Sequence, residues 1–300
     1  MSSEETTTTE TEETAKGART PSRRQLLKQS LLGLAALVAM DSVFVEPRTL
    51  RVETVTIPMP GLSAAFDGYR IALLTDFHYP RWIRPDLIRR AIALGNYFQP
   101  DLMAFTGDFF DLPHAPQVPD ITGFYDQAKA KDGVVGVLGN HDHVLNADLV
   151  RSALAAKTPI RLIENQSLLV ERGGQALAVG GVGDLWHGVV DPERAFANVA
   201  PEVPRILLSH NPDLAEEMQP NVRVDLQLSG HTHGGQIRIP FGPALLVPSR
   251  YGNKFSQGLV QGKRHRVYTS RGLCTVRWVR FWCPPEVTHI TLRAAPAAHA

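Results

Sequence analysis

Two histidines separated by a single residue are the first side chains in this sequence whose types and spacing could do chemistry. His231 and His233 follow the segment 224–228, in which apolar and polar residues alternate, and glycines flank them at Gly230 and Gly234. Imidazole nitrogens are common transition-metal ligands, and glycines let the backbone turn sharply beside a bound group. Such pairs also occur on ordinary protein surfaces. The pair therefore predicts a metal site only if other donor groups converge on it.

Four further apolar segments end in polar side chains of the same kind. The segments 69–75, 101–106, 133–138 and 205–209 are nearly uninterrupted apolar runs, which predicts strands buried on both faces. In such folds the functional groups gather at the carboxyl ends of the strands. A single polar residue at a strand end is usually a cap or a turn residue. Polar residues at the ends of five strands are not explained in that way. The five strand ends together supply Asp76, His78, Asp108, Asn140, His210, His231 and His233.

The order of the predicted elements indicates an α/β fold. Apolar residues at helical spacing predict helices over 85–98, 122–130 and 147–157. The remaining strands are expected at 51–57, 168–170, 176–179, 267–268, 279–281 and 287–292. There is no repeat of fixed period and no internal linker after about residue 48, so 46–295 is expected to form one domain.

Composition narrows the class of protein. The chain has 300 residues, of which 43% are hydrophobic, and this is enough for a large core. Its formal net charge is +1, so there is no global basic field, and no nucleic-acid partner is expected. Cys274 and Cys283 are too few for a disulfide framework. They are expected to form either a single bridge or two buried thiols.

The N-terminal region is expected to be a targeting segment and not part of the folded domain. Residues 1–21 are rich in Ser, Thr and Glu and should form a disordered tail. In 22–45 a twin arginine precedes the apolar run 31–40, as in a twin-arginine export signal. That run is shorter than the roughly 20 residues needed to span a bilayer, and no Ala-x-Ala cleavage site precedes Asp41. We therefore predict passage through the export machinery to the cell envelope, with the segment retained as a membrane anchor.

The motifs taken together, in their order, resemble one known family. They read Asp76-x-His78, Gly107-Asp108-x-x-Asp111, Gly139-Asn140-His141-Asp142, His210 and Gly230-His231-x-His233. This series resembles the calcineurin-like metallophosphoesterase family, and most closely its twin-arginine-exported, membrane-associated bacterial branch. The likeness continues through 235–240, 270–273 and 284–286 and covers nearly all of 50–293.

The resemblance implies a fold and a metal centre. The fold would be a four-layer sandwich of two mixed β-sheets flanked by α-helices. One metal ion would be held by Asp76, His78 and His233, and a second by Asn140, His210 and His231. Asp108 would bridge the two ions together with a hydroxide. Two divalent ions facing only two carboxylates keep a net positive charge, which suits a phosphate group. Manganese is expected, with iron and zinc as the alternatives.

The same resemblance implies two catalytic residues that are not ligands. His141 adjoins the predicted ligand Asn140, so it could protonate the leaving oxygen or stabilise charge there. Asp111 would orient His141 and keep it protonated. Asp142 is expected to be a turn residue or helix cap.

The predicted activity is metal-dependent hydrolysis of a phosphodiester or pyrophosphate bond at the cell envelope. The alternative is hydrolysis of UDP-2,3-diacylglucosamine in lipid A synthesis, which is a cytoplasmic reaction and so conflicts with an export signal. A protein phosphatase and a non-catalytic metal-binding envelope protein are further rivals. Six aromatic residues could line a groove for the acyl chains of a lipid-linked substrate, or could simply pack in the core. They are Trp82, Trp186, Trp278, Trp282, Phe109 and Phe110.

Overall fold

The computed structural model describes residues 22–111 and 122–295, so the predicted disordered tail lies outside the described residues. The chain divides into two compact units, Met1–Met40 and Asp41–Ala300. Each unit is considered by itself. All four hydrophobic clusters of the described residues lie in the second unit, which therefore contains the whole apolar core.

The first unit contains one described helix, α1 (Arg23–Met40), none of whose residues is buried. Helical turns continue through Asp41–Val45 and Glu46–Arg48. The stretch Arg23–Arg48 is 26 residues long and could cross a membrane by its length and composition, although a signal sequence meets the same criteria. The apolar run 31–40 was predicted to be too short to span a bilayer. That prediction counted only the run itself and left out the helical turns on either side of it.

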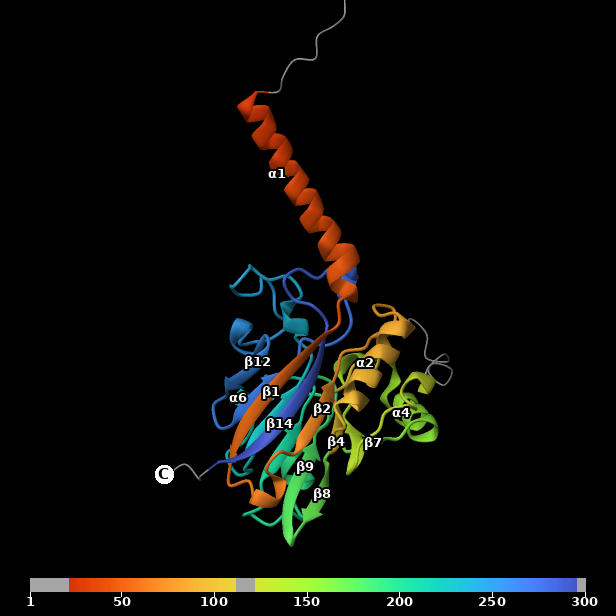
Figure 1. Ribbon diagram of the computed structural model, residues 1–300. Coiled ribbons are helices and arrows are strands. Elements are labelled where there is room, and N and C mark those ends of the chain that lie inside the picture. Colours follow the sequence, from red (N-terminus) through yellow and green to blue (C-terminus); the bar gives the residue numbers. More distant parts are fainter. Residues whose placement is uncertain (1–21, 112–121, 296–300) are drawn as a thin grey trace, which may run out of the picture. The chain divides into compact units, whose positions relative to one another are not determined.

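Two six-stranded sheets form the centre of the second unit (Figure 1). The first has the order β1 (Arg51–Pro60), β14 (Glu286–Ala295), β2 (Arg70–Leu74), β4 (Leu102–Phe105), β6 (Gly133–Gly136), β7 (Ile160–Leu162). The second has the order β12 (Gly258–Gln261), β13 (Arg266–Thr269), β11 (Leu226–Ser229), β10 (Arg205–Leu208), β9 (Gln175–Gly181), β8 (Gln166–Arg172). Both are mixed, because β14–β2, β12–β13 and β8–β9 pair antiparallel and the other neighbours pair parallel. A small ladder joins β3 (Tyr79–Pro80) to β5 (Phe110–Asp111).

Helices cover the outer faces of the two sheets, which gives the predicted four layers. α2 (Pro85–Tyr97) and α4 (Asn140–Lys157) pack on the first sheet, while the short α5 (Pro192–Ala195) and α6 (Leu214–Glu217) lie over the second (Figure 1). Strand β2 shows why its sequence is apolar without alternation. Ile71 and Leu73 point into the core between the sheets, whereas Ala72 and Leu74 point toward the helices.

Two of the predicted elements were wrong. The helix expected over 122–130 is only a single 3-10 turn, Thr122–Phe124. The Asn96 side chain donates to Gln127 O and accepts the Lys129 N–H, so these backbone groups are bonded to another element instead of to a helix of their own.

The strand expected at 279–281 is reduced to one bridge between Ile237 and Phe281. Arg280 is fully buried in this segment, and its guanidinium donates to the carbonyls of Cys274, Cys283 and Arg271. The left-handed backbone at Trp278 (φ 60°) and Trp282 (φ 56°) bounds this segment on both sides and leaves no regular strand.

Helix α4 begins seven residues before the predicted residue 147, and it is interrupted at Asn146. Asp142, expected to be a cap, lies fully buried in its first turn. The carboxylate accepts the backbone N–H groups of Gly139 (3.0 Å), Phe110 (3.0 Å) and Phe109 (3.2 Å). One carboxylate therefore caps the helix and also fixes the loop that follows β4.

We predict that Asp142→Asn destabilises the fold by about 1–3 kcal/mol, because an amide nitrogen would face backbone donors. Burial, together with the charge of Asp108, raises the pKa of Asp142 to about 6, so the test belongs at a pH above 7, where the carboxylate is charged. Chemical denaturation of metal-free protein measures the effect. The control is Asp148→Asn on the same helix, whose side chain is 93% exposed. Equal losses of stability in both variants would contradict this role.

Candidate metal centre

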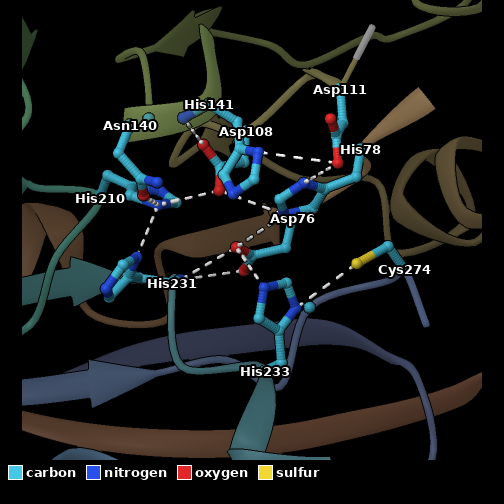
Figure 2. A network of polar contacts seen from close by, with 12 residues as sticks. Asp76, His78, Asp108, Asp111, Asn140, His141, His210, His231, His233 and Cys274 are labelled. Carbon is cyan, nitrogen blue, oxygen red and sulfur yellow. Dashed lines mark hydrogen bonds and ion pairs between the residues drawn. The ribbon is translucent and has the colours of Figure 1, made fainter. Parts of the chain in front are cut away.

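The seven predicted donors come together at the carboxyl ends of neighbouring strands (Figure 2). β2, β4 and β6 are parallel neighbours in the first sheet, and β10 and β11 are parallel neighbours in the second. Loops from these five strands therefore leave at one edge of the sandwich. Asp76 and His78 follow β2, Asp108 follows β4, Asn140 opens α4 after β6, His210 follows β10, and His231 and His233 follow β11.

The backbone at this edge is held in an unusual conformation. Five candidate ligands have positive φ angles, a region that side chains other than glycine rarely adopt. Such conformations persist where the surrounding structure holds them, and they cluster at functional sites. The angles are 55° at Asp76, 48° at His78, 54° at Asp108, 70° at His231 and 52° at His233.

Two glycines of the motifs make room for these carboxylates. A Cβ atom at Gly139 would lie 2.2 Å from Asp108 Oδ1. At Gly230 it would lie 2.2 Å from Thr75 Oγ1 and 2.4 Å from Asp76 Oδ2. Any side chain at these two positions would push Asp108 or Asp76 out of place.

Lone pairs crowd around one ring nitrogen of the buried His210. Its Nδ1 lies 2.7 Å from the Thr106 carbonyl, which accepts only if Nδ1 carries the proton. In the neutral ring Nε2 is then a free acceptor. It faces Asn140 Oδ1 at 3.1 Å, His231 Nδ1 at 3.1 Å and Asp108 Oδ2 at 3.2 Å. At most one proton, from a neutral His231, can point at this nitrogen, so the Asn140 and Asp108 oxygens still face its lone pair unless a cation lies among them.

The nearby negative charge also decides the protonation of His210. Burial alone would lower the pKa of His210, but the nearby Asp108 carboxylate outweighs burial and raises the pKa to about 10. The reciprocal effect of His210 and His78 holds the pKa of the buried Asp108 well below its usual range. A proton on His210 thus supplies positive charge that a bound metal ion would supply instead.

Asp108 lies at the centre of the site. Its Oδ2 is 3.1 Å from His78 Nε2 and 3.2 Å from His210 Nε2, so it contacts both predicted groups of ligands. Its Oδ1 accepts the backbone N–H of His141 at 2.9 Å. Asp76 Oδ1 lies 4.0 Å from the same His78 Nε2 and 3.8 Å from His233 Nε2.

The donor set fits divalent metal ions. Both ring nitrogens of His78 and Nε2 of His231 are buried without a hydrogen bond of acceptable geometry, although His78 lies within ion-pair distance of Asp108. Buried polar atoms are normally satisfied, so the His78 nitrogens, which lie within 4.0 Å of carboxylate oxygens, call for a missing partner. Among the described residues, His78, Asp108 and His141 form one group that could hold an ion, and Asp108, His210 and His231 form another.

His141 and Asp111 lie next to each other at the edge of this cluster. His141 Nδ1 is 3.7 Å from Asp111 Oδ2, and the His141 side chain is 42% exposed, so a substrate can reach it. Asp111 also accepts the indole N–H of Trp82 at 2.8 Å and lies 3.6 Å from Arg81. Burial opposes ionisation of Asp111, but His141, His78 and Arg81 together lower its pKa, so it remains a carboxylate.

The sequence interpretation missed the contribution of Cys274. Both cysteines are free and buried, so of the two alternatives the structure has thiols. The Cys274 Sγ lies 3.5 Å from His233 Nδ1 (Figure 2), and with His78 and His233 it forms a third group that could hold an ion. Cys283 contacts the His233 carbonyl oxygen instead, at 3.4 Å. The nearby Ser270-Arg271-Gly272-Leu273 segment was the only sequence signal for this position.

The six aromatic residues do not form one groove. Phe109 and Phe110 are fully buried among other aromatic rings, because the loop that carries Asp108 packs into the core there. Trp186 lies edge-on to His231, at the metal centre itself. Trp82 and Trp278 contact each other elsewhere, and Trp278 and Trp282 are about half exposed. Of the two alternatives, packing in the core therefore holds for the two phenylalanines.

Comparison with known proteins is consistent with this site. Residues 69–235 match the calcineurin-like phosphoesterase family. The chain is 32% identical to the uncharacterized metallophosphoesterase YkuE of Bacillus subtilis over 91% of this chain and 98% of that protein. It is 33% identical to the phosphodiesterase YaeI of Escherichia coli over 75% of this chain and 82% of that protein.

A more distant relative is the UDP-2,3-diacylglucosamine pyrophosphatase LpxG of Chlamydia muridarum. The identity is 24%, over 86% of this chain and 95% of that protein. The family uses a dinuclear divalent metal centre, and the described residues contain groups able to bind such ions. The chain belongs to the calcineurin-like phosphoesterase family and is a metal-dependent phosphoric ester hydrolase.

Proposed function

We propose that this protein is a dinuclear-metal phosphodiesterase or pyrophosphatase that acts at the cell envelope. The observation that carries the proposal is the cluster of acceptors around His210 Nε2, where Asn140, His231 and Asp108 approach within 3.2 Å. That arrangement is costly in a buried site without a cation, and phosphoryl oxygens need the same positive charge.

The proposed ligand assignment follows the contacts. Asp76, His78 and His233 would hold one ion, Asn140, His210 and His231 the second, and Asp108 both. Two divalent ions held there would bind phosphate oxygens and acidify the water that serves as the nucleophile. Backbone groups orient these ligands. The Thr106 carbonyl fixes the His210 tautomer, and the His231 backbone N–H anchors Asp76 at 3.0 Å.

His141 would act on the leaving oxygen. It is the exposed imidazole of the cluster, and its backbone N–H is tied to Asp108, so its position is fixed relative to the proposed bridge. Asp111 would keep it oriented and protonated, and would itself be held by the Trp82 indole. A protonated His141 can donate its proton as the bond to the leaving group breaks.

The proposed substrate is a phosphodiester or pyrophosphate, and we favour one linked to a lipid. The name of YaeI supports diester hydrolysis, and that of LpxG supports a lipid-linked pyrophosphate. UDP-2,3-diacylglucosamine hydrolysis is the alternative that the LpxG relative favours. Release of uridine monophosphate from that lipid, faster than diester hydrolysis, would select it.

The proposed location rests on the N-terminal region. Arg23 and Arg24 precede the apolar helix α1, which supports twin-arginine export followed by retention in the membrane. Export of the folded chain by that machinery would allow manganese, our proposed metal, to be loaded in the cytoplasm.

We predict that His141→Ala lowers turnover of bis-p-nitrophenyl phosphate about a hundredfold or more, because the general acid is lost. Turnover is measured with residues 41–300, stripped of metal and then given Mn, Zn, Fe or Mg separately. The monoester p-nitrophenyl phosphate is the comparison substrate. His143→Ala is the matched control, because His143 lies in the same helix and pairs with Glu164 instead of Asp111. No diester turnover with any metal, while the metals still bind, would reject the proposed activity.

We predict that adding Mn to the metal-free protein raises its melting temperature, because the ions relieve the repulsion among buried acceptors. Saturation at about a hundred times Kd stabilises by about 2.7 kcal/mol, which corresponds to roughly 5–10 °C for a unit of this size. Asp108→Asn should lose most of the shift, whereas His141→Ala should keep it. If Asp108→Asn showed the same shift as the unaltered protein, the bridging role of Asp108 would be wrong.

We predict that Cys274→Ser weakens Zn and Fe binding by about tenfold and Mn binding by less, because sulfur is the softer donor. Competition with a chromophoric chelator measures each affinity. Cys283→Ser is the matched control, since its thiol contacts the His233 backbone and not the ring. Equal changes for all metals would show that the Cys274 thiol does not set the metal preference.

A further inference from the structure

Exposed apolar side chains gather around the segment Asp41–Arg48, at the N-terminal end of the globular unit. Two pockets border this segment. The larger, of about 730 Å³, is lined in part by Val45, Phe241 and Trp282, and the smaller, of about 250 Å³, by Val43 and Trp278. Neither pocket contains a candidate metal ligand, so this region is distinct from the site already described.

The segment is fixed to the rest of the globular unit by hydrogen bonds. The Arg280 N–H donates to the Ser42 carbonyl at 3.0 Å. The Glu46 carboxylate accepts the Trp282 N–H at 2.9 Å and also the Cys283 N–H. The neighbouring loop 237–247 is tied to the same place, because the Arg238 N–H donates to Phe281 O at 3.0 Å.

The apolar side chains of this region are exposed to an unusual degree. Phe241 is 96% exposed, Leu246 80% and Leu245 67%, and the Phe241 ring lies edge-on to Trp282 with centroids 5.3 Å apart. Soluble proteins seldom expose large apolar groups together unless the surface binds something. We define the docking face as Phe44, Val45, Ile239, Phe241, Leu245, Leu246, Trp278 and Trp282, which are all exposed.

We propose that the docking face lies on a lipid bilayer. The proposal rests on the membrane anchoring proposed above. Met40 is bonded to Asp41, which lines the larger pocket, and the candidate span Arg23–Arg48 includes Phe44 and Val45 of the docking face. A helix that crosses a membrane brings the surface next to its end into contact with the lipid headgroups.

The chemistry of the face fits this partner. Tryptophan is favoured at the boundary between hydrocarbon and headgroups, and arginine side chains reach lipid phosphates. The smaller pocket is lined by three arginines and one carboxylate, Asp86, so this border of the face carries an excess of positive charge toward anionic lipids. A soluble apolar partner would not require that charge, which is why we favour a bilayer over a second protein.

The face is connected to the catalytic residues by short contacts. Trp82 lines the smaller pocket with Val43, and its indole donates to Asp111, which lies beside His141. The backbone N–H of Thr275 donates to Trp82 O at 3.0 Å, and that of Cys274 donates to Asp76 O at 2.8 Å. A docked protein would thus hold its metal centre near the headgroup region, so the substrate class is the phosphoester or pyrophosphate of a membrane lipid.

Vesicle co-sedimentation of residues 41–300 tests the proposal. This fragment contains every described hydrophobic cluster and lacks α1, so anchoring by the helix cannot produce the result. The probes are vesicles of phosphatidylethanolamine with phosphatidylglycerol, at physiological ionic strength. Phe241→Ser/Leu246→Ser should lower the partition coefficient by about tenfold or more, because two apolar anchors are removed.

The matched control is Tyr97→Ser/Leu169→Ser, which removes two other exposed apolar groups, 85% and 44% exposed. Tyr97 ends α2, about 18 Å along the helix from the end that borders the smaller pocket. This control should bind vesicles like the unaltered fragment, and all three proteins should hydrolyse the soluble diester equally.

A second measurement needs no destabilising variant. Lipids brominated in their acyl chains should quench the tryptophan fluorescence of the unaltered fragment, and Trp282→Phe should remove a large part of that quenching. No vesicle binding by the unaltered fragment, equal binding by the Phe241/Leu246 and control variants, or an absence of quenching would each overturn the proposal. Binding without any diester turnover would instead reject the proposed function and leave the docking face in place.

Discussion

Mutual repulsion among buried acceptors is the constraint on which the functional edge of this protein depends. Asp108 lies between His78 and His210 at 3.1 and 3.2 Å, with its other oxygen bound to the His141 backbone. His210 cannot donate to all of its neighbours, because its Nδ1 proton is directed at the Thr106 carbonyl. Only positive charge inside the cluster reconciles these contacts with burial. A pair of divalent ions, as the family uses, supplies it.

The scaffold must hold these groups close together against that repulsion. Parallel neighbours in both sheets deliver the loops to one edge, and left-handed backbone at Asp76, His78 and Asp108 turns the side chains inward. The Asp108 carbonyl accepts the N–H groups of Phe77 and His78, which ties the first two loops together. Asp142 then fixes the start of α4 to the loop after β4. The left-handed backbone conformations are thus held by several hydrogen bonds between neighbouring loops.

Residues that surround the candidate metal centre contact it on two sides. On one side the Cys274 thiol lies against His233, and a soft donor at that place would alter the preference among metals. On the other side Trp82 joins Asp111 to the region around Asp41–Arg48, where the apolar side chains are exposed. Metal selection and substrate access would then be decided by residues outside the seven recognised donors.

Much of this architecture could be predicted from the sequence, because it depends on local pattern and order. Apolar runs such as 71–74 predict strands that are covered on both faces, and polar residues soon after them predict a site at the strand ends. The predicted helix over 122–130 and strand at 279–281 were wrong. In both places one long-range side chain, Asn96 or Arg280, sets the backbone, and no local pattern contains that information.

The sequence by itself determined the fold class, the family and which side chains could bind metal, since these follow from residue types in a fixed order along adjacent strands. Only the tertiary structure decided which atoms face one another. It placed Cys274 against His233, directed Phe109 and Phe110 into the core, and brought Trp282 to Glu46. The reason is that such contacts join positions up to hundreds of residues apart, and packing of the whole domain selects them.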